Sequence, residues 1–170
     1  LGIGTNPNVT AEYIKEKGME IVITDHHIPP EEKQDYPDCL IINPSVPDDT
    51  YPFKYLAGVG VAFKLVSAII EKAKLNKDEK GLLKEKVLEL VGLGTVADCV
   101  RLFGENRTLV KKGLEMLNKT RRIGLKELIK ISSLENRNLD SWNIGFQLAP
   151  RINAAGRMAH ANTAVELLSI

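Results

Sequence analysis

Apolar residues in the first part of the chain fall into short, uninterrupted runs. Residues 21–24 and 39–42 are rich in β-branched side chains, and polar residues or proline close each run. Such runs are typical of parallel strands buried on both faces, because helices cover both sides of a parallel sheet. A helix is predicted over residues 10–17, with Thr10 as its N-cap and Gly18 beyond its C-terminus.

From residue 57 onward the apolar positions change to helical spacing. Val59, Phe63, Val66 and Ile70 predict a helix over residues 57–75. Further helices are predicted over residues 82–91, 107–117, 125–131 and 141–147. The order of helix, buried strand, loop and buried strand predicts an α/β fold, an open parallel sheet flanked by helices, followed by a mainly helical C-terminal part.

Composition and charge narrow the functional classes. The chain has 170 residues, of which 44% are hydrophobic, enough for one ordinary domain core. The net charge of +1 gives no general basic field, so any nucleic acid must be held by a local patch. Cys39 and Cys99 form neither a zinc pattern nor a disulfide framework, which favours a reducing, cytoplasmic location. The apolar runs are too short to predict a membrane span.

The sharpest candidate for chemistry is Asp25-His26-His27, which directly follows the first predicted strand. Side chains at the carboxyl end of a parallel strand face the crevice where open α/β sheets bind ligands. A carboxylate beside imidazoles suits Mn²⁺ or Mg²⁺, and the second histidine can reach a phosphate oxygen. The alternative is a loop that happens to carry two exposed histidines.

Asp98 is the second candidate. Gly92-Leu93-Gly94 is expected to end the preceding helix, so that residues 95–97 lead into Asp98 as the end of a strand would. A carboxylate there could bridge two divalent ions. Taken alone, an aspartate in this position would more often be a helix N-cap. Cys99 beside it is expected to be buried packing, because a thiolate is a poor ligand for hard cations.

The third candidate is the segment from Pro150 to Arg157. Arg151 and Arg157 offer planar forks of donors that match phosphate, and Asn153 adds a neutral donor and acceptor. The small residues between them would let the backbone approach a ligand. The alternative is a surface turn whose two arginines form salt bridges.

Taken together, these segments resemble the RecJ-type nucleases of the DHH phosphoesterase superfamily. Residues 22–27 are similar to the motif that names the superfamily, and residues 94–98 to its next acidic motif. The remaining similar segments are Ile42-Asn43-Pro44, Tyr51-Pro52-Phe53, residues 56–64, Asn106-Arg107 and residues 150–157. The resemblance covers nearly the whole chain, in the family's order.

The resemblance implies a two-ion catalytic centre that holds Mn²⁺ or Mg²⁺. Asp25, His26 and Asp98 would be metal ligands, and His27 would complete the catalytic group at the phosphate edge. The implied reaction is stepwise 5′-to-3′ hydrolysis of single-stranded nucleic acid to mononucleotides.

The same resemblance implies single-stranded DNA as the partner in repair, recombination or replication. Arg151, Asn153 and Arg157 would contact the DNA or the scissile phosphate. Proteins of replication or repair are further expected partners, and no membrane is.

Two motifs of the family are not in the chain: the early Asp-x-Asp-Gly motif and the Gly-rich motif of the downstream DHHA1 domain. The resemblance therefore implies an internal part of a longer protein, with little activity on its own. Residues 1–117 would be the C-terminal half of the DHH domain, and residues 118–170 a helical extension leading to DHHA1. His160 stands where the family varies and is interpreted as a surface or capping residue.

Two other functions stay open. One is another DHH phosphoesterase, acting on short oligonucleotides or cyclic dinucleotides; the segment 150–157 favours the nuclease over it. The other is a non-catalytic replication scaffold, which has no electrostatic reason to carry His26, His27 and Asp98 together.

Overall fold

The computed structural model describes residues 7–32, 35–158 and 161–170. His160 therefore lies outside the described residues. The first elements along the chain are α1 (Pro7–Glu16), β1 (Val22–Thr24), β2 (Leu40–Ile42), α2 (Gly58–Lys72) and α3 (Lys77–Ala97). They are followed by α4 (Gly104–Leu117), α5 (Ile123–Ile131), α6 (Ser141–Asn143), the π-helical segment η2 (Ile144–Leu148), α7 (Ala149–Met158) and α8 (Ala161–Ser169).

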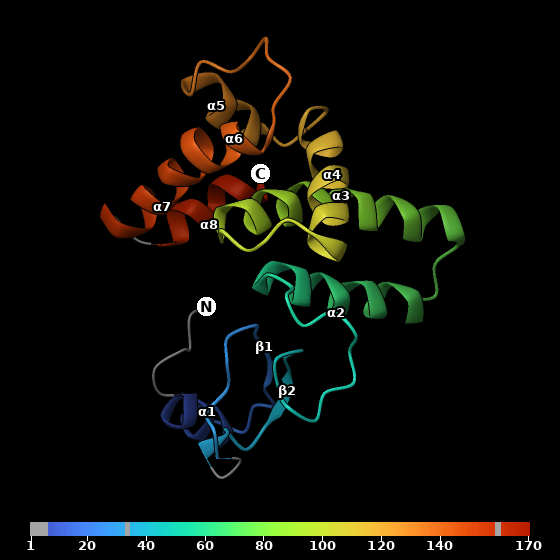
Figure 1. The fold of residues 1–170 in the computed structure, drawn as a ribbon, viewed down its shortest axis with the longest axis vertical. Helices are drawn as coiled ribbons and strands as arrows, with labels where there is room; N and C mark the ends of the chain where they lie inside the picture. Colours follow the sequence, from blue (N-terminus) through green and yellow to red (C-terminus); the bar gives the residue numbers. More distant parts are fainter. Residues whose placement is uncertain (1–6, 33–34, 159–160) are drawn as a thin grey trace.

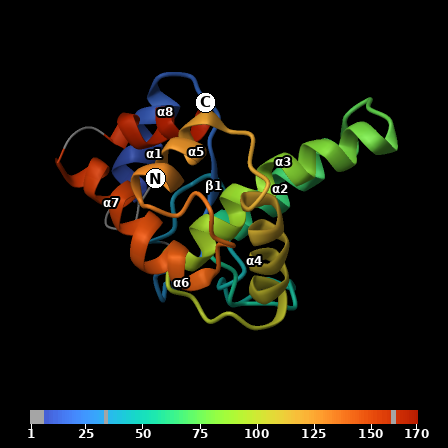
Figure 2. The same ribbon diagram turned by 90° about the horizontal axis from the view of Figure 1, so that it is seen from above.

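The strands lie at one end of the molecule and most helices at the other. Figure 1 shows α1, β1 and β2 together, with α2 between this group and α3. Helix α4 crosses α3 in Figure 1, and Figure 2 shows α5, α7 and α8 grouped beside the C-terminal half of α3. The α/β fold with a parallel sheet and a mainly helical C-terminal part is thereby confirmed.

Strands β1 and β2 pair in parallel, with Val22 opposite Leu40 and Thr24 opposite Ile42. Both strands were predicted, but their burial on both faces was not observed. Val22 is 48% exposed and Leu40 63% exposed in the described part of the chain. The sheet formed by the described residues has two strands, so each strand is paired along one edge only.

Helix α3 is much longer than the predicted helix over residues 82–91. It begins after Asn76, whose side chain accepts from the backbone N–H of Glu79 in a capping box, and it continues to Ala97. The expectation that Gly92 and Gly94 end the helix is wrong. Both glycines lie where another element comes close, and their small size serves that packing rather than a turn.

Helices α3 and α4 approach each other at Gly92 and Gly113. A Cβ atom at Gly92 would lie 2.8 Å from the Cα of Gly113, closer than carbon atoms can pack. A Cβ atom at Gly94 would lie 3.0 Å from the side chain of Val59 on α2. Glycine at these positions therefore lets α3 contact both neighbouring helices at short distance.

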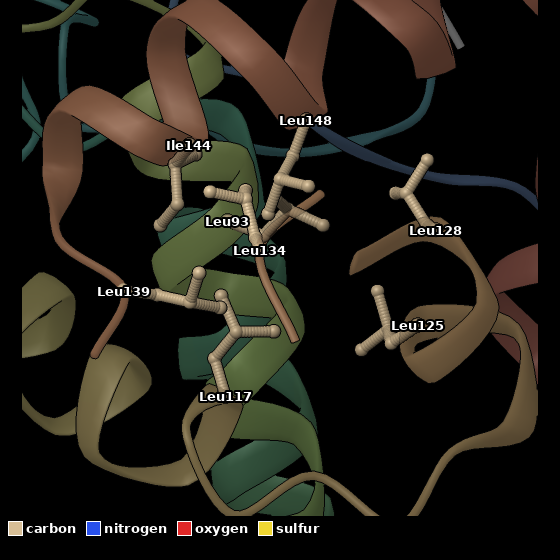
Figure 3. Packing of buried hydrophobic residues seen from close by; sticks show 8 residues of the cluster. All are labelled: Leu93, Leu117, Leu125, Leu128, Leu134, Leu139, Ile144 and Leu148. Atoms are coloured by element: carbon tan, nitrogen blue, oxygen red, sulfur yellow. The ribbon is translucent and has the colours of Figure 1, made fainter. Parts of the chain in front are cut away.

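Two hydrophobic clusters share α3 and α4. The cluster nearer the strands contains Leu56, Val61, Leu88, Val91 and Leu109. The other, shown in Figure 3, contains Leu93, Leu117, Leu125, Leu128, Leu134, Leu139, Ile144 and Leu148. Because both helices contribute to both clusters, the two ends of the molecule are held together by continuous apolar packing.

The C-terminal part departs from the prediction of a helix that stops before Pro150. Asp140 caps α6 by accepting from the backbone N–H of Asn143, and α6 runs through η2 into α7. A proline lacks an amide hydrogen and clashes with the carbonyl four residues earlier in an α-helix. A π-helical turn, wider than an α-helical one, ends at Leu148, two residues before Pro150, and the helix continues through the proline.

The segment Pro150–Arg157 was predicted to lie in a helical extension, with a surface turn as the alternative, and the structure excludes the turn. It lies within α7, and Ile152 packs against the second hydrophobic cluster. Small residues at helical spacing favour a packed helix as readily as a close backbone approach. Among the helices of the described residues, none is both long and apolar enough to cross a membrane.

Candidate metal and phosphate site

Asp25 organises the loop that follows β1. Its backbone N–H donates to the carbonyl of Ile42 at 3.1 Å, which extends the strand pairing by one residue. Its Oδ1 accepts from the backbone N–H of His26 at 2.7 Å and of His27 at 3.3 Å. The same oxygen lies 2.7 Å from Nδ1 of His27. This hydrogen bond orients the His27 ring so that Nε2 is the nitrogen that can bind a ligand.

The surroundings of Asp25 favour its charged form. Partial burial alone would raise the pKa of the carboxyl, but hydrogen bonds from the His27 ring and from the backbone N–H groups of His26 and His27 outweigh it. The pKa of Asp25 is therefore lowered below its usual value of 3.8. An ionised carboxylate is the state that a metal ligand requires.

Two residues after β2 form hydrogen bonds to the backbone of the loop that carries His26 and His27. The buried Asn43 donates from Nδ2 to the carbonyl of His27 at 2.9 Å, and its Oδ1 accepts from the backbone N–H of Ser45. The Ser45 hydroxyl donates to the carbonyl of His26 at 3.1 Å. The two strand ends are thus tied together, which fixes the backbone of both histidines.

Asp98 meets His26 although the two are distant in the sequence. Their side chains approach to 3.4 Å between Nε2 of His26 and Oδ2 of Asp98. The prediction that these two residues converge at a site is therefore confirmed. The expected local structure is wrong, because Asp98 caps the C-terminus of α3 and neither ends a strand nor begins a helix.

Helix α2 lies between the two halves of this site. A Cβ atom at Gly58 would lie 3.2 Å from Cδ2 of His26, a tight contact that would displace the ring from its present position. The next residue, Val59, contacts Gly94 of α3 on its other side. The sequence showed no sign of these contacts, which depend on elements far apart in the chain.

The donor set fits a hard divalent cation. One ligand atom each of Asp25, His26 and His27 lies within 4.8 Å of the others. Two ligands of an octahedral ion at ~2.1 Å lie roughly 3 Å apart, close to the 3.4 Å between His26 and Asp98. Carboxylate and imidazole donors suit Mn²⁺ or Mg²⁺. Because each ion takes about six donors, two ions need ligands beyond these four residues.

Cys99 does not behave as predicted. It was expected to be buried, but it is exposed and has a left-handed backbone conformation with φ of 58°. This conformation is uncommon for a residue with a side chain. It turns the chain sharply after Asp98, so that Val100 and Arg101 return beside the histidine loop.

The three polar residues of the 150–157 segment form a separate group on α7. Arg151, Asn153 and Arg157 are exposed, and Arg151 donates to the carbonyl of Gln147 at 2.6 Å. Within the described residues, neither arginine forms a salt bridge, and no hydrogen bond or ion pair joins any of the three to the Asp25–Asp98 group. Gly145, just before α7, faces Val96 on the last turn of α3. The segment therefore begins near Asp98 without joining its donor set.

A family model described as the DHH family, N-terminal domain, matches residues 3–95, more than half of the chain. Among curated relatives, the chain is 47% identical over 158 residues to the single-stranded-DNA-specific exonuclease RecJ of Bacillus subtilis. That match covers 93% of this chain and 19% of the relative. The corresponding protein of Escherichia coli is 35% identical over 176 residues, covering 97% of this chain and 29% of the relative.

Solved structures match over almost the whole chain. A structure of exonuclease RecJ bound to manganese has a TM-score of 0.77 and 32% identity, covering 98% of this chain and 39% of that one. RecJ from Thermus thermophilus in complex with Mn²⁺ has a TM-score of 0.78 and 32% identity, covering 99% of this chain and 24% of that one. The chain thus spans about a fifth to two fifths of the length of these proteins.

Proposed function

The chain belongs to the DHH family, and from this premise we propose that it carries part of the two-metal phosphodiesterase site of a 5′-to-3′ single-stranded-DNA exonuclease. The observation that carries the proposal is the 3.4 Å approach of His26 to Asp98 beside Asp25 and His27. Relatives that match nearly all of the chain are named single-stranded-DNA-specific exonucleases. Two structures similar to it contain Mn²⁺.

Each residue of the group has a distinct proposed role. His26 and Asp98 are the metal ligands that link the two halves of the site. Asp25 offers one oxygen to a metal while the other holds the His27 ring, and His27 is directed at a phosphate oxygen. Bound divalent ions supply Lewis acidity towards the phosphate and acidify water. The protein contributes a fixed arrangement of donors and excludes alternative ring orientations of His27.

Arg151, Asn153 and Arg157 are proposed to bind the nucleic acid at a place on α7 that is separate from the metal ligands. They are exposed on α7, and the two arginines have no carboxylate partner among the described residues. Arginine in this state is available to phosphate. A single-stranded chain that crosses α7 would reach the site at the end of α3, which Figure 1 shows beside α7.

The wider assignments rest on the same premise. We propose that residues 1–117 complete a DHH domain whose other half lies elsewhere in the protein, and that residues 118–170 connect it to a DHHA1 domain. Cytoplasmic repair, recombination or replication is the proposed setting, with proteins of those processes as partners.

The test is hydrolysis of 5′-labelled single-stranded DNA by the complete protein in the presence of Mn²⁺. Replacing His26 with Ala or Asp98 with Asn should reduce the rate at least a hundredfold, because outer partners alone change activity or metal affinity about 10–100-fold. Asp78→Asn is a matched control, since Asp78 is an exposed carboxylate in the first turn of the same helix.

Mononucleotides released from the 5′ end of single strands, together with loss of activity in Asp98→Asn but not in Asp78→Asn, would support the proposal. Hydrolysis of cyclic dinucleotides but not of DNA would replace it with the second DHH phosphoesterase function. Equal activity of both variants would remove Asp98 from the site.

A further inference from the structure

A cleft of about 610 Å³ opens beside the metal-ligand group and shares His26 as part of its wall. Its other walls come from the loop after β2, the loop before α2 and the turn after Asp98. Most of the lining is apolar, and the polar side chains are few: Ser45, Lys54, Tyr55, Cys99 and Arg101 beside His26. A cleft of this size lies in the range of small-molecule and cofactor sites.

The buried amide of Asn106 holds two walls of the cleft together. Asn106 is fully buried, and its Nδ2 donates to the carbonyl of Tyr55 at 2.6 Å and to that of Arg101 at 3.1 Å. The ring of Tyr55 also packs against Phe103, with centroids 5.2 Å apart. These contacts fix the backbone of both loops, so the cleft is formed without a ligand.

Tyr55 and Arg101 remain available to a ligand. Tyr55 is 58% exposed although its ring lies against Phe53 and Phe103. Lys54 is held by Asp49, because its ammonium donates to the Asp49 carbonyl at 2.5 Å. The Arg101 guanidinium, by contrast, makes no hydrogen bond or ion pair with any described residue. The cleft therefore offers one exposed aromatic ring and one cation without a partner in the described part of the chain.

We infer that this cleft binds the base and sugar of the nucleotide whose phosphate lies at the His26–Asp98 group. The inference rests on the proposed function and adds a subsite to it. Aromatic rings that stack on bases, combined with cations along the backbone, are how proteins hold single-stranded nucleic acid. His26 belongs to both the donor group and the cleft wall. A nucleotide whose phosphate lies at the donor group therefore has its nucleoside at the cleft.

The lining indicates binding without base selectivity. The Ser45 hydroxyl is engaged with the carbonyl of His26, and Lys54 is held by Asp49. Few side-chain donors or acceptors are left to read the edge of a base, whereas stacking on Tyr55 tolerates every base. Arg101 is placed to pair with a neighbouring phosphate of the strand.

The experiment measures binding of deoxyadenosine 5′-monophosphate and of deoxyribose 5-phosphate to the complete protein in Mn²⁺, by calorimetry. The two probes share the phosphate and sugar and differ in the base. Tyr55→Ala should weaken binding of the nucleotide about tenfold and leave deoxyribose 5-phosphate unchanged, whereas Tyr55→Phe should retain the affinity for both. Tyr13→Ala is the matched control, because Tyr13 is also 58% exposed but lies on α1.

A second readout uses the exposed thiol of Cys99 in the cleft lining. The nucleotide should slow alkylation of Cys99 severalfold more than deoxyribose 5-phosphate does, as followed by mass spectrometry of the Cys99 peptide. Tyr55→Ala should remove that difference. The peptide with Cys39, which lies outside the cleft lining, serves as the internal control.

Equal affinity of the wild-type protein for the two probes, or an equal effect of Tyr55→Ala on both, would overturn the subsite. So would Cys99 protection that does not depend on the base. These outcomes are independent of hydrolysis. If the protein is an active nuclease but its binding does not depend on the base, only this inference fails. If the protein is inactive but its binding does depend on the base, only the proposed function fails.

Discussion

Adding one methyl group at Gly113 should destabilise the fold, whereas the same change at Gly81 should stabilise it. A Cβ atom at Gly113 would lie 2.6 Å from the Cα of Gly92 and 2.6 Å from the Leu88 carbonyl oxygen. Both are backbone atoms of α3, so no side chain can rotate away. At Gly81, in the same helix α3, nothing lies within 4 Å of such an atom.

The two changes have the same intrinsic helix preference and differ only in packing. Alanine is favoured over glycine by about 1 kcal/mol in a helix interior, which is the gain expected at Gly81. At Gly113 the helices must move apart, and overpacking costs about 1–3 kcal/mol or more. Because α3 and α4 contribute to both hydrophobic clusters, separation loosens both. Because the close atoms are backbone, we take the upper end of that cost, about 3 kcal/mol, and subtract the helix gain of about 1 kcal/mol, which leaves a net loss of roughly 2 kcal/mol for Gly113→Ala.

Thermal and urea unfolding of both variants measure this difference. For a chain of this size, about 1 kcal/mol corresponds to about 2–4 °C in Tm. Gly81→Ala should therefore raise Tm by about 2–4 °C, and Gly113→Ala should lower it by roughly 4–8 °C. A Tm for Gly113→Ala at or above that of the unsubstituted protein would show that α3 and α4 do not cross at this distance.

Three further predictions concern charged residues. Arg151→Ala or Arg157→Ala in the complete protein should weaken single-stranded-DNA binding by about 1–3 kcal/mol and reduce its salt dependence, with little change in Tm. A large fall in Tm at unchanged DNA affinity would show that these arginines are structural. Arg122→Ala should lower the free energy of unfolding by about 3–5 kcal/mol in urea, because it leaves the buried Glu89 carboxylate without its cation, and an unchanged value would contradict that pairing. The pKa of Asp25 is lowered in the folded state, so its contribution to stability is present above the unfolded pKa of 3.8 and is lost as the pH falls through the folded pKa. Unfolding of Asp25→Asn, measured with a chelator present, should therefore depend less on pH below about pH 4.

The part of the site that could be predicted is the part encoded locally. Asp25, His26 and His27 follow a β-branched run and precede two prolines, and a short strand followed by a loop is the structure that such neighbours favour. The pairing of β1 with β2 in parallel also followed from two similar runs separated by a loop. Strand length, loop position and histidine placement depend on few residues, which is why the sequence indicated them.

Long-range contacts account for the features that the sequence did not indicate. Gly92 and Gly94 were expected to end a helix, because glycine disfavours helices when packing is not considered. In the structure each glycine faces another helix, and this packing outweighs the local preference. The same limit applies to Asn106, whose role depends on the carbonyls of two separate loops. Asp98 was correctly placed near His26, although the reason given, a strand end, was wrong.

The beginning of α2 connects these observations to the site. Ala57, its N-cap residue, makes no side-chain hydrogen bond to the helix, and glycines follow at positions 58 and 60. A capping side chain would stabilise such a start by about 0.5–2 kcal/mol, and alanine would improve each glycine position further. The residues at the start of α2 are therefore not those that would make the helix most stable.

The small residues at the start of α2 instead allow neighbouring elements to approach closely. Gly58 leaves space for the ring of His26, and the adjacent Val59 contacts Gly94 one turn before Asp98. The first turn of α2 thus contacts both the His26 ring and the helix that carries Asp98, and these two side chains approach to 3.4 Å. Sequences break local rules mainly where function requires it, and here the unfavourable helix start lies between the two proposed metal ligands.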